Sequence, residues 1–215
     1  MIGGTSSRLA ALAAASFFLI APVPLAVAQD AGDLLGRCQS EDVQSRQRVE
    51  ACSKLVGDTK LEADLRAEAL LNRGVAYEDL GKDAEALGDY TAAIALNPDY
   101  PAPYGYRGAL HERLGRHDEA IKDHSVVLKL MPDDYDALHA RGRSYLIVGN
   151  SKAALGDFEQ LVRLDAKDPD ALVGRAFARE DLGDKAGALA DFKAALGIEP
   201  DNEDAKEGIE RLRGG

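Results

Sequence analysis

Four consecutive stretches of this chain have the same length and carry the same residue types at the same places. Numbered from 1 to 34, they occupy residues 67–100, 101–134, 135–168 and 169–202. Position 15 is always glycine, position 20 is always alanine and position 24 is always a ring: Gly81, Gly115, Gly149, Gly183; Ala86, Ala120, Ala154, Ala188; Tyr90, His124, Phe158, Phe192. A period of this length is typical of chains that stack one small supersecondary unit several times.

Each of these recurring residue types has a physical explanation if every copy forms a pair of antiparallel helices. Small residues at positions 8 and 20 let the two helices approach closely, and a ring at position 24 fills the space between them. Glycine at position 15 suits the left-handed conformation that commonly ends a helix. Proline at position 32, present in three copies, stops the second helix. Apolar residues recur at helical spacing between these marks, so each copy is predicted to form a helix–turn–helix.

These residues resemble the tetratricopeptide repeat, a helical repeat of 34 residues with a G-x-x-Y, A-x-x-x-F and P pattern. The resemblance covers residues 67–202 and implies an all-α fold, a right-handed α-solenoid with a concave groove. It also implies protein binding rather than catalysis. The expected units are TPR 1 (67–100), TPR 2 (101–134), TPR 3 (135–168) and TPR 4 (169–202), followed by a capping helix and tail (203–215) whose acids come first and whose arginines come last.

The first 28 residues read as a secretory signal. They contain a single charge at Arg8, an apolar run over 9–20 and an A-x-A exit ending at Ala28. The apolar run is short for a membrane span. We expect cleavage after Ala28, export to the periplasm of a bacterium, and no membrane insertion afterwards; an uncleaved anchor is the alternative.

Residues 29–66 are expected to form a degenerate helical repeat that holds the only two cysteines, Cys38 and Cys52. An exported chain meets an oxidising compartment, where an isolated pair forms a disulfide. A redox couple or half of a metal site is the alternative. We favour a structural disulfide because the spacing is not C-x-x-C and no histidine lies nearby.

The balance of charge argues against nucleic acid as a partner. The whole chain has 26 Lys and Arg against 37 Asp and Glu, a net charge of −11. Loss of Arg8 with the signal leaves 25 against 37, or −12. An acidic chain repels a phosphate backbone.

Catalytic motifs are not found. His111 and His117 in "HERLGRH" superficially resemble a zinc-protease helix, but H-E-x-x-H needs histidines four residues apart on one helical face. Here they are six apart, with Gly115 between them. No nucleophile elbow or P-loop occurs either. We expect no cofactor, no bound metal and no enzymatic activity; a small metal-dependent enzyme built on the second repeat is the alternative.

Two histidines of the second repeat, His111 and His124, stand where this repeat usually has packing rings. One interpretation is a pH-sensitive pair, since imidazole titrates near neutrality. The other, which we favour, is two core rings that share hydrogen bonds.

An arginine at position 7 and an aspartate at position 23 recur in every copy. Packing of a second helix against the next first helix would place these positions opposite each other, and the alternative is pairing within a repeat. We predict three pairs between repeats: Asp89–Arg107, Asp123–Arg141 and Asp157–Arg175.

By resemblance, positions 2, 5, 9, 12 and 13 of the first helices face the concave groove. They are Glu68, Leu71, Val75, Glu78, Asp79; Ala102, Gly105, Ala109, Glu112, Arg113; Asp136, His139, Arg143, Leu146, Ile147; and Asp170, Val173, Phe177, Glu180, Asp181. Eight are acidic and two are basic, a net charge of −6.

Six of these residues form an apolar floor: Leu71, Val75, Leu146, Ile147, Val173 and Phe177. Together with the acids, they predict a protein or peptide partner with apolar and basic residues. A clamp for acidic C-termini is not expected, because position 9 offers no lysine or asparagine. The alternatives are an acidic face that binds nothing, and a structural subunit of an envelope assembly held through its convex or N-terminal surface.

Overall fold

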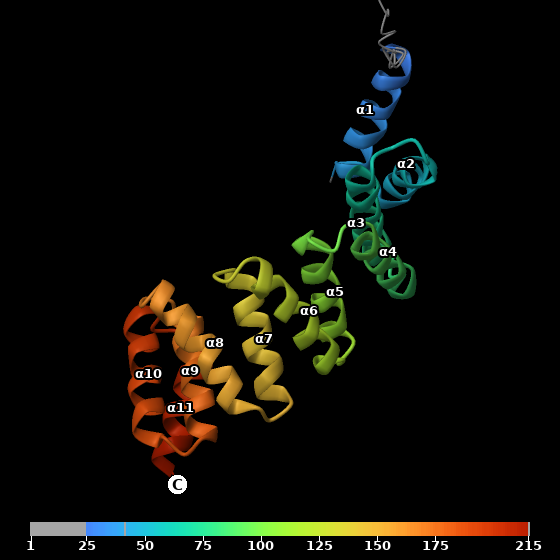
Figure 1. Cartoon of the computed structure of the whole chain (residues 1–215). Coiled ribbons are helices and arrows are strands. Elements are labelled where there is room, and N and C mark those ends of the chain that lie inside the picture. The colour runs from blue at the N-terminus through green and yellow to red at the C-terminus, as the bar shows by residue number, and fades with distance from the viewer. Residues whose placement is uncertain (1–24, 41, 215) are drawn as a thin grey trace, which may run out of the picture.

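The computed structural model describes residues 25–40 and 42–214, and within them it contains helices and no strand (Figure 1). The helices are α1 (Leu25–Gln39), α2 (Ser45–Gly57), α3 (Ala63–Asp79), α4 (Asp83–Leu96), α5 (Pro101–Arg113), α6 (His117–Leu130), α7 (Tyr135–Ile147), α8 (Ser151–Leu164), α9 (Pro169–Asp181), α10 (Lys185–Ile198) and α11 (Glu203–Gly214). The expectation of an all-α fold is confirmed. Most of the expected signal segment 1–28 lies outside the described residues, and its last four residues begin α1.

The helices stack in chain order into an elongated array (Figure 1). Each helix packs against the helices before and after it. The first helices α3, α5, α7 and α9 also contact one another in succession, and α9 contacts α11. Over the described part of the chain, α4, α6, α8 and α10 make no such contacts with one another. The stack therefore bends toward its first helices, which form the inner face of an α-solenoid.

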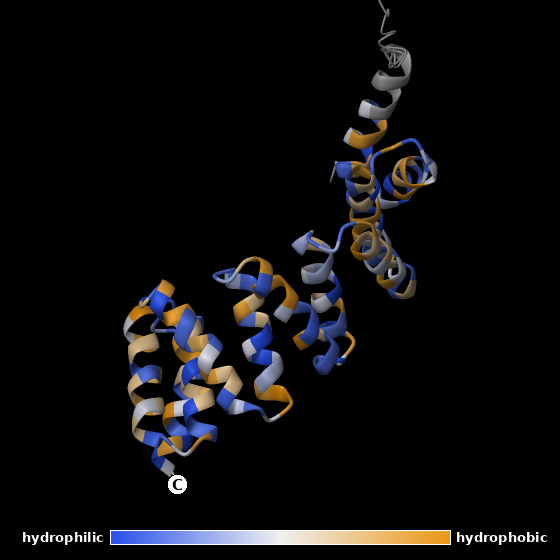
Figure 2. Cartoon of the chain, viewed as in Figure 1, coloured by the Kyte–Doolittle hydropathy of each residue, from blue (hydrophilic) through white to orange (hydrophobic). Residues whose placement is uncertain are grey.

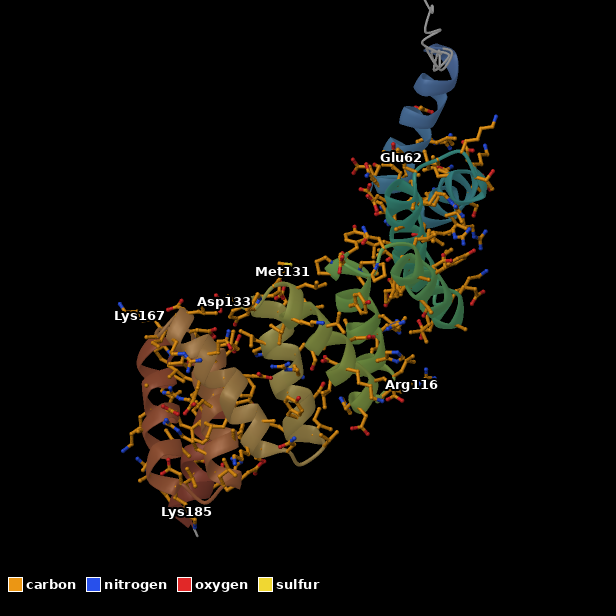
Figure 3. The ribbon with its side chains drawn as sticks, viewed as in Figure 1. Glu62, Arg116, Met131, Asp133, Lys167 and Lys185 are labelled. Atoms are coloured by element: carbon orange, nitrogen blue, oxygen red, sulfur yellow. A yellow bond between two sulfur atoms is a disulfide. The ribbon has the colours of Figure 1, made fainter. Side chains whose placement is uncertain are left out.

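The turns lie in two rows along opposite edges of the stack. Figure 3 shows Met131, Asp133 and Lys167 on one edge, where one helix pair joins the next, and Arg116 and Lys185 on the other. On this second edge the predicted left-handed glycines are confirmed, with φ of 70°, 72°, 79° and 84° at Gly81, Gly115, Gly149 and Gly183. The amide three residues past each of these first helices also donates back to the helix's last turn, as from Lys82 N to Tyr77 O at 2.8 Å.

The ring at position 24 is the centre of each helix pair. Tyr90, Phe158 and Phe192 are fully buried. A Cβ added to Gly142 would lie 3.0 Å from the Phe158 ring, and one added to Gly174 of the next first helix would lie still closer. Glycine at these two places therefore lets both α7 and α9 pack directly on one phenyl ring.

The capping helix is confirmed by the same contact. Gly208 of α11 lies directly against the Phe192 ring of α10, and Ala205 and Ile209 are buried beside it. The last helix pair thus covers its apolar face with a helix that repeats the role of a first helix, as the end of a solenoid requires.

Hydrophilic and hydrophobic residues alternate along the helices, as expected for helices that bury one face and expose the other (Figure 2). Among the described residues, no helix combines the length and hydropathy needed to cross a membrane.

The recurring arginine pairs with an aspartate of its own repeat. Arg141 donates from Nε and Nη2 to the two carboxylate oxygens of Asp157, at 2.9 and 2.6 Å. The same two-bond pairs occur at Arg73–Asp89, Arg107–Asp123 and Arg175–Asp191. The predicted pairs Asp89–Arg107, Asp123–Arg141 and Asp157–Arg175 are therefore wrong.

The geometry of the guanidinium explains the difference. Positions 7 and 23 face each other across one antiparallel helix pair, so two donors of the fork meet one carboxylate there. The remaining nitrogen, Nη1, reaches the previous repeat instead: that of Arg141 donates to Ser125 Oγ at 3.1 Å, and that of Arg107 to Thr91 Oγ1 at 3.0 Å. The arginine does tie successive repeats together, through a hydroxyl rather than through a carboxylate.

The N-terminal end of the stack carries the predicted disulfide. Cys38 of α1 is bonded to Cys52 of α2, and both are fully buried in a small apolar cluster. α2 packs against α3 as the second helix of a preceding repeat would. The disulfide therefore ties α1 to the helix that covers the first full repeat.

Two glycines on neighbouring helices test the role of the ring. We expect Gly174→Ala to lower the free energy of unfolding by about 1–3 kcal/mol, because its methyl group collides with the Phe158 ring. The matched change Gly156→Ala, on α8 with nothing near the added methyl group, should be neutral or raise stability by up to about 1 kcal/mol. Urea denaturation followed by circular dichroism measures both, and equal effects would contradict the contact.

A double-mutant cycle tests the pairing. We expect Arg141→Ala and Asp157→Ala each to cost about 2–4 kcal/mol of unfolding free energy, because each leaves a largely buried charge without its partner. The double variant should cost little more than either single one. The cycle with Asp123 in place of Asp157 should give near-additive losses, and Arg163→Ala, exposed on α8, should change little.

Candidate functional site

Three cavities lie between successive first helices on the inner face. The α5–α7 cavity has a volume of about 440 Å³ and the α7–α9 cavity about 470 Å³. A connecting cavity of about 300 Å³ shares Ala109 with the former and Arg143 and Ile147 with the latter. The shared residues make the three cavities one continuous surface, called here the groove.

The α7–α9 cavity brings together the largest set of predicted groove residues. From α7 and α9 it takes His139, Arg143, Leu146, Ile147, Asp170, Val173 and Phe177. The ring of Phe158 and the backbone of Gly174 complete its wall, and Asp204 of α11 joins from the cap. Most of the apolar surface is firmly packed: Val173 is 6% exposed, and the Phe177 ring lies 5.3 Å from that of Phe192. Ile147 is different, because 59% of it is exposed.

The α5–α7 cavity has small side chains on both of the first helices that line it. Ala102, Gly105 and Ala109 of α5 face Ala137 and Ala140 of α7 across it. Its further lining residues are Pro101, Tyr106, His124, Val127, Met131, Asp134 and Asp136. Small residues on both helices leave room there for a side chain from outside.

Seven predicted groove residues line none of these cavities: Glu68, Leu71, Val75, Glu78, Asp79, Glu180 and Asp181. Leu71 and Val75 of α3 pack instead in the core around Tyr90. The groove of the structure therefore lies over α5, α7 and α9, and α3 contributes to the core beside it.

Most of the predicted groove acids hold neighbouring helices together. Glu78 pairs with Arg113 of the next repeat at 2.9 Å, and Glu180 pairs with Arg211 of α11 at 2.6 Å. This contact with Arg211 lowers the pKa of Glu180. The other paired acids are Glu68 with Gln39, Asp79 with Arg48 and Ser45, Glu112 with Ser144, and Asp181 with Ser151.

Few charges in the groove are left without a partner within the described chain. Asp136, Asp170 and Asp204 make no side-chain hydrogen bond or ion pair there, and neither does Arg143. The two basic groove residues thus differ, since Arg113 is paired with both Glu78 and Asp83. The groove offers a partner three free carboxylates and one guanidinium.

Sequence reasoning missed Asp204, His124 and Tyr106 as lining residues. Asp204 had a visible signal, because it lies 34 residues after Asp170 and continues position 2 into the capping helix. His124 stands at the ring position of the repeat, and Tyr106 places its ring beside that of Tyr90 in the preceding repeat. Residues at such positions line a cavity only when the residues facing them from the next repeat are small. The sequence of one repeat alone does not show whether they are.

The two histidines of the second repeat occupy different environments. His124 is 4% exposed, and no hydrogen bond joins it to His111 in the described structure. The His124 Nε2 atom lies 3.2 Å from Oε1 of Glu112, although its N–H is not aligned on that oxygen. The interpretation as a packed core ring fits His124, whereas His111 is only half-buried, and the shared hydrogen bonds are not present in the described structure.

Within residues 25–40 and 42–214, no three His, Cys, Asp or Glu side chains are arranged to hold a metal ion. The histidines of "HERLGRH" are placed apart, with His111 on α5 and His117 at the start of α6.

Comparison with known families and structures adds a family relationship. Models described as "Tetratricopeptide repeat" match residues 67–100 and, separately, residues 84–134 and 139–203. A search of the curated proteins found no match.

Several solved structures are similar in fold. A tetratricopeptide repeat protein from Parabacteroides merdae has a TM-score of 0.74 at 22% identity, with 86% of this chain and 72% of that one covered. MamA from AMB-1 has a TM-score of 0.70 at 16% identity, covering 82% and 93%. YrrB, described as a TPR protein with an unusual peptide-binding site, has a TM-score of 0.68 at 20% identity, covering 77% and 84%.

The contacts of Glu112 predict a dependence of stability on pH. Burial tends to raise the pKa of Glu112, but its contacts with His124 and Ser144 outweigh burial and hold the pKa below the ordinary 4.5. A lowered folded-state pKa stabilises the fold above pH 4.5, and this contribution is lost as the pH falls through the folded value. We expect Glu112→Gln to be less stable than the parent chain at pH 7, by about 1 kcal/mol, and the gap to shrink toward pH 3.

Urea denaturation at several pH values measures this gap. Glu210→Gln, on the exposed face of α11, serves as the control and should show no pH-dependent difference. A gap for Glu112→Gln that stays constant from pH 7 to pH 3 would contradict the assignment.

Proposed function

Because this chain belongs to the tetratricopeptide-repeat family, whose members are generally non-catalytic protein-interaction modules, we propose that it binds a segment of another protein in the groove over α5, α7 and α9. The observation that carries the proposal is the continuity of the three cavities across two repeat junctions, with apolar walls in the α5–α7 and α7–α9 cavities and a mainly polar cavity between them. YrrB, a protein of similar fold, is described as having a peptide-binding site.

The free charges of the groove define the proposed partner. Asp136, Asp170 and Asp204 follow one another at the same repeat position along its rim. A segment with an apolar anchor and flanking lysine or arginine complements that row. Arg143 lines both the α7–α9 and the connecting cavity, and its guanidinium would donate hydrogen bonds to one acidic group or to a backbone carbonyl of the partner. The preference for basic residues thus rests on fewer acids than the sequence suggested.

Export is part of the same proposal. The first 28 residues have the pattern of a secretory signal, and a buried disulfide between the only two cysteines suits an oxidising compartment. We place the protein in the bacterial cell envelope, most simply in the periplasm. Cell fractionation and N-terminal sequencing of the mature chain test this location; a chain that begins at Met1 and stays in the cytoplasm would refute it.

The groove is best tested at Ile147, since it is the most exposed apolar residue there and its replacement leaves the core intact. Short randomised peptides displayed on phage are selected on the mature chain, and their affinities are measured by fluorescence polarisation. We expect Ile147→Glu to weaken the selected peptides at least about tenfold, because a charge then stands in the apolar floor. Val173 and Phe177 are poorer choices, because both are packed in the core.

A matched control comes from the same chain. Leu164 at the end of α8 is 49% exposed and lines none of the three cavities, so Leu164→Glu should leave the affinities within about twofold. Selected peptides should also be enriched in apolar and basic residues. Equal loss in both variants, or none in either, would show that the groove is not the binding site.

A further inference from the structure

The α5–α7 cavity lies where α5 has smaller side chains than the other repeats at two groove positions. α5 carries Gly105 at position 5 and Ala109 at position 9, and both residues line the cavity. The other three full repeats have larger residues at these two positions: Leu71 and Val75; His139 and Arg143; Val173 and Phe177. The cavity therefore marks a local departure from the repeat pattern.

Gly105 is not required by the packing between helices. A Cβ added to Gly108, Gly142 or Gly174 would meet a position-24 ring at 3.0 Å or closer, so those glycines permit a close contact. A Cβ added to Gly105 would meet no atom of a neighbouring element within 4 Å. Glycine is also unfavourable inside a helix relative to alanine. Gly105 therefore widens the cavity without serving the contact between α5 and its neighbours.

The inner wall of this cavity is mainly apolar. Glycine and alanine residues of α5 and α7 face each other across it, and Tyr106, Val127 and Met131 add larger apolar surfaces. His124 is also part of the wall, but both of its ring nitrogens are shielded from solvent and are not available to an outside group. A hydroxyl or a charge in the interior would lose its hydrogen bonds to water without replacement. The interior therefore suits an apolar side chain.

The cavity is large enough for a bulky side chain and is accessible from outside. Its volume of about 440 Å³ falls within the about 300–1,000 Å³ of ordinary small-ligand sites. Of its lining residues, Tyr106 is 46% exposed and Met131 is 44% exposed. Met131 lies on the edge of the stack where one helix pair joins the next (Figure 3). Apolar surface of the cavity is therefore open to a partner.

Carboxylates stand at one end of the cavity. Asp134 is held in place as the cap of α7, where its Oδ1 accepts a hydrogen bond from Ala137 N at 2.9 Å. Asp136, in the first turn of α7, is one of the free carboxylates of the groove. Among the described residues that line the cavity, none is lysine or arginine. This end of the cavity therefore favours a cationic group of the partner.

We propose that the α5–α7 cavity is the anchor pocket of the groove. It takes one bulky hydrocarbon side chain of the partner segment, and the residue next to this anchor is a lysine or arginine that pairs with Asp136. The inference rests on the proposed function, because it assigns the apolar anchor and its basic neighbour to one cavity. From the anchor, the segment continues past Ala109, which the α5–α7 cavity shares with the connecting cavity.

Three small probes test the pocket without knowledge of the partner. 2-Phenylethylammonium joins a phenyl ring to a cation, 3-phenylpropanoate joins the same ring to an anion, and tyramine adds a hydroxyl to the ring of the first probe. Each is titrated into the ¹⁵N-labelled mature chain, and amide shifts on α5 and α7 are followed. We expect 2-phenylethylammonium to bind about three- to tenfold more tightly than 3-phenylpropanoate. Tyramine should bind no more tightly than 2-phenylethylammonium, because its hydroxyl finds no partner in the interior.

Two pairs of variants locate the binding. Gly105→Leu fills the cavity from a position with open space around it, and should weaken 2-phenylethylammonium at least about tenfold. Gly156→Leu, at an equally open glycine on the exposed face of α8, should leave the affinity within about twofold.

Asp136→Asn removes the charge at the end of the cavity, so the affinities of 2-phenylethylammonium and 3-phenylpropanoate should then lie within about twofold of each other. Asp118→Asn, in the first turn of α6 and exposed, lines none of the three cavities and should leave the preference for the cation unchanged. Circular dichroism confirms that the four variants are folded.

Several results would overturn the anchor pocket: equal or tighter binding of 3-phenylpropanoate, tighter binding of tyramine, or shifts confined to other helices. Binding that survives Gly105→Leu, or a preference for the cation that survives Asp136→Asn, would also overturn it. Peptides selected on the mature chain separate this failure from failure of the groove. If Ile147→Glu weakens them and Gly105→Leu does not, the groove binds peptides without an anchor in this cavity; if neither variant weakens them, the groove is not the binding site.

Discussion

The packing of two first helices on one aromatic ring is the contact on which the rest of the structure depends. Phe158 is held between Gly142 of its own repeat and Gly174 of the next, and Phe192 likewise contacts Gly208 of the capping helix. Such close contacts require glycine on the first helix, because even a Cβ atom there would collide with the ring. They draw the first helices together while the second helices stay apart, and this difference bends the stack and places the groove on the first helices.

A second set of contacts sets the register between repeats. Each arginine at position 7 uses two donors inside its own repeat, and those of Arg73, Arg107 and Arg141 use the third on a serine or threonine hydroxyl of the element before. In the last junction that hydroxyl is replaced by Glu159, whose charge acts on Arg175 from the same side. The arginine is therefore held in its own repeat by two hydrogen bonds, and its third donor group is left to bond to the preceding helix and fix that helix's position.

The sequence was sufficient to predict the repeat, its turns, the cap and the disulfide. Each of these depends on a residue type with one main structural role, such as glycine in a left-handed turn or an isolated pair of cysteines. The pairing of arginine with aspartate could not be decided in the same way. Both residues recur with the same period, so pairing within and between repeats gives identical patterns. The prediction of the groove met a similar ambiguity. Glu78 and Glu180 stand at positions that face the inner surface, yet Glu78 pairs with Arg113 of the next first helix and Glu180 pairs with Arg211 of the capping helix. Whether such a carboxylate is free to bind another protein or is paired within this chain depends on a single residue about one repeat away.

Single residues that differ between repeats can therefore change the inner surface without changing the fold. A ring at position 24 is both the plug of its own helix pair and the floor of the space before the next first helix. An imidazole ring at this position still fills the space between the two helices, since His124 is only 4% exposed. The change is compatible with folding because the Arg107–Asp123 pair still joins the two helices of this repeat, and the hydrogen bond from Ser144 to Glu112 still joins the repeat to the next one. A substitution at this position therefore changes the wall of a cavity between two repeats without removing the ring that holds its own helix pair together.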